Sequence, residues 1–187
     1  MANSLFQCNT SNVDEMRHGR PQTVLNDAER PNGVIVTLGG TLEAQEGLGR
    51  EYDHCHAITE GALTAVVGAY VVVAPEIMED EYRTINGQIG KFALKADETY
   101  SAYRLQKHDR LEYSEAYFDG ADELEVGDKV NVQAAGDSGE RFVASETGCL
   151  RVVSIANLWM PVMLKANSKE GALMPASVKM IKVEVEK

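Results

Sequence analysis

The stretch Lys107-His108-Asp109-Arg110-Leu111-Glu112-Tyr113-Ser114 decides the fold class, because an Asp at a turn is followed at once by alternating apolar and polar residues. In a strand, Leu111 and Tyr113 would point to one face while the polar residues point to the other. A second stretch, Val126-Gly127-Asp128-Lys129-Val130-Asn131-Val132, has the same design, with a Gly-Asp turn that leads into two valines directed toward a core. Both stretches indicate a compact β-domain.

Further strands are predicted on both sides of these two stretches. They cover 33–38, the run Val71-Val72-Val73, 100–105, the returning hairpin strand 141–144, 150–155 and the C-terminal 178–187. In the last of these, Ile181, Val183 and Val185 would share one face. About eight short strands separated by Gly-rich turns predict a mainly β fold, a compact β-barrel or β-sandwich with little helix.

The first 32 residues differ from the rest, since they are polar and are interrupted by Pro21 and Pro31. Proline fixes its own φ and pushes the preceding residue toward extended geometry. We therefore expect residues 1–32 to form an extended N-terminal arm, on the chain's own domain or on a neighbouring subunit. Residues 33–187 would form the β-rich domain, with a sub-boundary near 134–150.

Charge and composition exclude several function classes. The 187-residue chain has a net charge of −11, and residues 51–128 hold 17 acidic and 6 basic side chains while the rest of the chain holds 12 of each. A nucleic-acid partner requires clustered Lys and Arg, so no direct nucleic-acid contact is expected. Apolar runs are too short to span a membrane, and three widely spaced cysteines predict synthesis in a reducing cytoplasm without a disulfide framework.

One cluster contains metal-ligand residue types: Asp53-His54-Cys55-His56, followed by Glu60. On a strand His54 and His56 would share a face, as two ligands of one metal must. The spacing of Gly49, His54, His56, Glu60 and Gly68 approximates the first metal-binding motif of the cupin barrels. The second cupin motif is missing, because no Pro-x-Gly follows the first motif and the last histidine is His108. The alternative interpretation is a polar loop or exposed strand.

No other motif points to catalysis. The sequence has no Gly-x-Ser-x-Gly, and Gly47-Leu48-Gly49 lacks the rest of a phosphate-binding loop. We therefore expect no enzyme activity and no cofactor. The residue types that dominate protein interfaces suggest five contact residues, on the arm and near the single tryptophan: Arg17, Arg20, Pro21, Val24 and Trp159.

Three stretches together resemble a known group of proteins. Val72-Val73-Ala74-Pro75-Glu76, Ala102-Tyr103-Arg104-Leu105 with Asp109, and Val126-Gly127-Asp128 with Val130 occur in this order in accessory head proteins of tailed bacteriophages, which decorate or cement the capsid. The opening Met1-Ala2-Asn3-Ser4-Leu5-Phe6 is similar to that group as well. The resemblance covers about residues 33–133 and is made of strand-and-turn patterns.

The resemblance implies a non-enzymatic virion structural protein that is made in the host cytoplasm and binds the capsid exterior. Its partners would be the major capsid protein and copies of itself, in a homo-oligomer. An acidic surface is compatible with a position away from packaged DNA. Two alternatives stay open: a cupin-like metal-dependent enzyme that uses His54, His56 and Glu60, and a tail-associated structural module with similar β-rich patterns.

Overall fold

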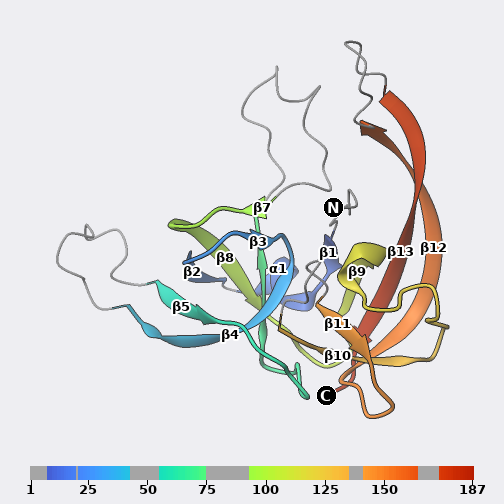
Figure 1. The fold of residues 1–187 in the computed structure, drawn as a ribbon. Coiled ribbons are helices and arrows are strands. Elements are labelled where there is room, and N and C mark those ends of the chain that lie inside the picture. The colour runs from blue at the N-terminus through green and yellow to red at the C-terminus, as the bar shows by residue number, and fades with distance from the viewer. Residues whose placement is uncertain (1–7, 20, 43–54, 75–92, 135–140, 164–172) are drawn as a thin grey trace.

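The computed structural model describes residues 8–19, 21–42, 55–74, 93–134, 141–163 and 173–187. They form a closed five-stranded barrel beside a curled six-stranded sheet (Figure 1). Within these residues, helix is limited to α1 (Asp14–His18) and one 3-10 turn, η3 (Glu115–Tyr117). The mainly β fold with little helix is therefore confirmed.

The barrel is formed by β2 (Gln22–Asn26), β5 (His56–Thr59), β4 (Val34–Thr41), β6 (Tyr70–Val73) and β8 (Glu98–Arg104), in that order around the ring. Strands β2 and β5 are parallel, and all other neighbours are antiparallel. A two-stranded sheet of β3 (Arg30–Pro31) and β7 (Ala93–Leu94) lies beside the barrel (Figure 1).

The six-stranded sheet is antiparallel throughout. Its order is β1 (Cys8–Asn12), β9 (Arg110–Ser114), β13 (Leu173–Val185), β12 (Leu150–Met163), β10 (Lys129–Val132) and β11 (Phe142–Ala144). The predicted hairpin is present, since β10 pairs with β11. The predicted faces are confirmed as well: Leu111, Val130 and Val183 are fully buried.

The barrel and the sheet share one wall. Along β4 and β6, side chains alternate between two cores: Val34, Val36 and Val72 point into the barrel, whereas Ile35 and Val71 pack against the six-stranded sheet. A strand with both faces buried reads as a continuous apolar run, which is why these segments lack the apolar-polar alternation of half-exposed strands.

The Asn32-Gly33 turn connects the barrel to the six-stranded sheet through hydrogen bonds. The hydroxyls of Tyr113 and Tyr117, on the sheet side, donate hydrogen bonds to the backbone carbonyls of Gly33 and Asn32. The Asn32 side chain donates to the Ala74 carbonyl and accepts from the Ala74 N–H, which ties the turn to the end of β6. Because all these groups are buried, each hydrogen bond also avoids the cost of an unpaired polar atom.

The expected arm is built into both bodies where the structure describes it, at 8–19 and 21–32. Strand β1 pairs with β9 at an edge of the sheet, and β2 is a barrel strand that pairs with β5 and β8. Val13 and Val24 are fully buried. This stretch is therefore part of the folded domain rather than a separate appendage, because its apolar side chains are needed in the two cores.

Candidate functional site

The proposed metal ligands do not form a site within the described residues. His56 lies on β5 with Nδ1 3.1 Å from the carbonyl oxygen of Gly39. His54 and Asp53 lie outside the residues that the structure describes. Among the described residues, no group of three or more His, Cys, Asp and Glu side chains is arranged to hold a metal ion.

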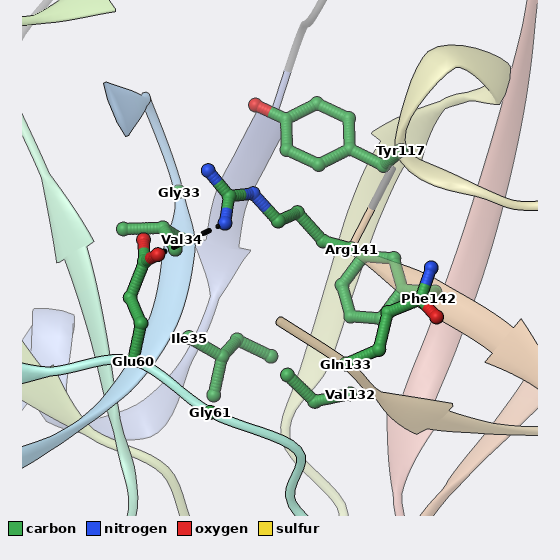
Figure 2. A pocket seen from close by; sticks show the side chains of 10 residues that line it. All are labelled: Gly33, Val34, Ile35, Glu60, Gly61, Tyr117, Val132, Gln133, Arg141 and Phe142. Atoms are coloured by element: carbon green, nitrogen blue, oxygen red, sulfur yellow. Dashed lines mark hydrogen bonds and ion pairs between the residues drawn. The ribbon is translucent and has the colours of Figure 1, made fainter. Parts of the chain in front are cut away.

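Glu60 has a different role from the one expected, because its carboxylate lies between two arginines, of which Figure 2 shows Arg141. Arg30 Nε donates to Glu60 Oε1 at 2.9 Å, and Arg141 Nη1 donates to Glu60 Oε2 at 3.1 Å. Both arginine side chains are more than nine-tenths buried, whereas Glu60 is 23% exposed. A carboxylate whose two oxygens already neutralise guanidinium groups is a poor metal ligand, so the arrangement favours a structural ion-pair cluster.

Arg30 is held from several sides in this cluster. Its Nη1 donates to Asn26 Oδ1 at 2.7 Å and lies 2.6 Å from Asp27 Oδ1. Asn26 is itself fully buried, and its amide nitrogen donates to the carbonyls of Leu94 and Lys95. These contacts join β2 and β3 to β7, and Glu60 continues the connection to Arg141, which directly precedes β11 of the sheet.

A cavity lies beside Glu60 and Arg141, at the junction of the barrel and the sheet (Figure 2). Its other walls are mostly apolar and include Ile35, Val132 and Phe142. The space open to the centre of a water molecule is about 10 Å³, which is room for about one water and far less than the 300–1,000 Å³ of a typical small-molecule site. Arg141 Nε is buried and has no hydrogen-bond partner in the part of the chain that the structure describes.

A second charged cluster, which the sequence did not reveal, lies on the solvent face of the six-stranded sheet. Glu184 on β13 is flanked by Arg110 on β9 and Arg151 on β12, at 2.8 and 3.3 Å, with His108 Nδ1 at 3.3 Å. Hydrogen bonds from Arg110 and His108 lower the pKa of Glu184 below its ordinary value. Glu184 lies on the face opposite Ile181, Val183 and Val185, yet it is only 5% exposed.

The two Asp residues of the turn motifs organise backbone. Asp109 accepts hydrogen bonds from the N–H groups of Gln106 and Asp14, and Asp128 accepts from the N–H of Glu125. The bonds from Gln106 and Glu125, each three positions before its Asp, are the local side-chain-to-backbone bonds that make Asp a turn residue, whereas the bond from Asp14 joins distant parts of the chain. Asp109 is buried at 4% exposure, and both of these hydrogen bonds hold backbone in place.

The five expected contact residues have different positions. Val24 is fully buried in the barrel core, so it cannot form an external contact, and this expectation is corrected. Pro21 is exposed just before β2, Arg17 lies in α1, and Arg20 lies outside the described residues. Trp159 lies on β12 opposite Ser177 of β13.

Strands β12 and β13 continue well past the rest of the sheet as a two-stranded ribbon that projects from the body (Figure 1). Their pairing runs from Leu150 opposite Val185 to Met163 opposite Leu173. The sequence predicted only the halves nearest the body, at 150–155 and 178–187. A signal was present nevertheless, because residues 152–163 and 173–178 include no charged side chain, although charged residues make up 25% of the chain.

Two of the three cysteines have thiols that burial disfavours as nucleophiles. Cys8, Cys55 and Cys149 form no disulfide with one another, and burial raises the pKa of the Cys55 and Cys149 thiols. A raised pKa disfavours the thiolate, which is the nucleophilic and metal-binding form.

Comparisons with protein-family models, with curated proteins and with solved structures found no match to the chain. Among the described residues, no helix has the length and apolar character needed to cross a membrane.

Proposed function

We propose that this chain is a non-enzymatic structural protein of a tailed-phage virion, which binds the outer surface of the capsid and stabilises or decorates it. Its partners on the particle would be the major capsid protein and further copies of itself. The proposal rests on the sequence resemblance to accessory head proteins together with the roles of the resembling residues in the fold.

The observation that carries the proposal is that the resembling stretches are scaffold. Residues 72–74 end the shared-wall strand β6, and 102–109 contain the end of β8 and the turn into β9. Residues 126–130 form the turn into β10, where Gly127 has a φ of 106°. Because the resembling residues build strands and turns, the resemblance supports a structural role for the chain more than a catalytic one.

The distribution of charge supports an exterior position. Residues 51–128 hold the whole net charge of −11. A protein that faces packaged DNA gains affinity from Lys and Arg, whereas an acidic one is repelled. The capsid exterior is the surface on which an acidic protein avoids this repulsion.

Quantitative mass spectrometry and cryo-electron microscopy of purified particles test the proposal. We expect many copies per particle, on the capsid exterior, and rebinding of the purified chain to particles from which it has been stripped. Absence from particles, or a position on the inner capsid surface, would refute the proposal.

A tail-associated module is the second candidate, because a projecting two-stranded ribbon suits any assembly in which subunits interlock. The same images separate the two, since density confined to the tail would select it. The cupin-like enzyme gains no support from Glu60, whose oxygens both accept from arginines. Stoichiometric iron, manganese or zinc in the purified protein, lost in a His54→Ala/His56→Ala variant, would revive it.

A further inference from the structure

Among the described residues, no strand pairs with the outer edges of the β12–β13 ribbon along most of its length. Strand β10 pairs with β12 only at Leu150 and Arg151, and β9 pairs with β13 only from Met180 to Glu184. Within the described residues, no strand pairs with the outer edge of β12 from Ser154 to Met163. An isolated two-stranded ribbon is marginally stable in water, and an open edge is a template for another strand.

The two open edges differ. The edge of β13 is approached near the body by the turn that follows η3, since Lys179 Nζ donates to the Ala121 carbonyl at 2.6 Å. The edge of β12 beyond Val152 has no comparable neighbour among the described residues. Leu158, in the middle of that edge strand, is a large apolar side chain with 42% exposure.

Two facing prolines define how far another strand could pair. Pro161 lies directly opposite Pro175, and neither has an N–H to give to the other. This pair must therefore be one of the ladder's non-hydrogen-bonded positions, where backbone groups point outward to the open edges. Counting back by twos along β12, the outward N–H groups belong to Ile155, Asn157 and Trp159, and the edge is blocked at Pro161.

We propose that β12 is the interface with a second copy of this chain, in which residues 154–160 of the two copies pair antiparallel about a two-fold axis. A strand edge that pairs with its own equivalent is self-complementary, as a two-fold interface requires. The pairing would convert two two-stranded ribbons into one continuous four-stranded sheet.

The lack of charged residues along the ribbon favours a second copy of this chain as the partner of β12. Each copy has a net charge of −11, so most surfaces of two copies repel each other. Residues 152–163 and 173–178 of the ribbon include no charged side chain, so two copies can pair along β12 without burying like charges. The cores of protein interfaces are likewise depleted in charged residues.

Light scattering on the full chain, at concentrations from below 1 to about 100 µM, a range that brackets micromolar dissociation constants, tests the interface. We expect a dimer, and at least roughly tenfold weaker association in Asn157→Pro, which removes an outward N–H, and in Leu158→Lys. Val126→Lys is the matched control, because Val126 is 64% exposed on a turn outside the ribbon. A monomeric wild type, or equal weakening by Val126→Lys, would overturn the inference.

Hydrogen exchange gives a readout that does not depend on the variants. Amides of Ile155, Asn157 and Trp159 should be protected in the dimer and exchange fast in the monomer. Amides of Ala156 and Leu158, which face β13, should be protected in both states. A dimer whose outward amides stay unprotected would place the interface elsewhere. The inference is independent of virion binding, since a monomer that still coats capsids would overturn it and leave the proposed function standing.

Discussion

Replacing Gly33 by Ala would strain the turn that joins the barrel to the sheet. Gly33 has a φ of 85°, a conformation that residues with a Cβ atom rarely adopt. An added Cβ would lie 2.5 Å from the Cβ atom of Cys8 and nearer still to its Sγ. These atoms belong to β1, a strand paired with β9, so relief requires movement of the strand as well as of a side chain.

The structure separates the free-energy cost into two parts. The left-handed backbone costs about 1–2 kcal/mol for a residue with a Cβ. Overpacking against Cys8 adds about 1–3 kcal/mol, so Gly33→Ala should lower the free energy of unfolding by about 2–5 kcal/mol. For a chain of this length, the melting temperature should fall by about 2–4 °C for each kcal/mol.

Gly120→Ala is the matched control, because Gly120 has a φ of 67° and nothing within 4 Å of the added Cβ. Gly120→Ala should therefore lower the free energy of unfolding only by the cost of the left-handed backbone. Both variants also gain stability because alanine makes the unfolded chain less flexible, so this gain cancels in the comparison. Urea unfolding followed by circular dichroism should therefore place Gly33→Ala about 1–3 kcal/mol below Gly120→Ala.

A double-mutant cycle tests the assigned cause. Cys8→Gly removes both clashing atoms, so Gly33→Ala should cost less in that background by about 1–3 kcal/mol. Equal costs for Gly33→Ala and Gly120→Ala, with no coupling to position 8, would refute the reasoning.

Three further predictions concern polar groups at the junction of the barrel and the sheet and within the sheet. Glu60→Gln should destabilise the fold by about 3 kcal/mol, because it leaves two buried arginines without their shared counter-charge. The control Glu98→Gln, in the exposed Lys95–Glu98 ion pair, should cost less than about 1 kcal/mol. Equal costs in urea unfolding would contradict the role of the Glu60 cluster. Because the pKa of Glu184 is lowered in the folded state, the stability that it contributes should be present above the unfolded pKa and lost as pH falls through the folded one. Glu184→Gln should flatten that part of a stability curve measured between neutral pH and strongly acidic pH, and an unchanged acid slope would assign the effect to other carboxylates. Asn32→Ala should cost about 2–3 kcal/mol, because the N–H and carbonyl of Ala74 lose their buried partner, and a cost under about 0.5 kcal/mol in thermal melts would mean that the turn relaxes freely.

The sequence predicted the strands in which period-two alternation meets a recognisable turn. Strands β9 and β10 follow Asp109 and Asp128, and both the strands and their buried faces are as expected. Strand β2 was missed, because its buried residues include Asn26 beside Val24. Asn26 is acceptable there only because the carbonyls of Leu94 and Lys95 receive its amide, and those partners are distant in sequence.

The role of Glu60 could not be read from its neighbours in the chain. Its proximity to His54 and His56 suggested a metal ligand, whereas its partners Arg30 and Arg141 lie 30 and 81 positions away. Only the closure of the barrel against the sheet brings those guanidinium groups together. The far half of the ribbon was missed for a local reason, since Pro161 and Pro175 argue against strands unless they face each other at non-hydrogen-bonded positions.

The place of β13 in the sheet has a consequence for synthesis on the ribosome. It lies between β9 and β12 and is the last described strand to be made. The barrel strands lie between residues 22 and 104, so the barrel can close while the sheet still lacks its central strand. Until β13 arrives, the larger core lacks Ile181, Val183 and Val185, and a nascent chain with such an incomplete core exposes apolar surface and is a substrate for chaperones. We therefore expect ribosome stalling before residue 173 to yield a nascent chain whose barrel is folded but which binds chaperones.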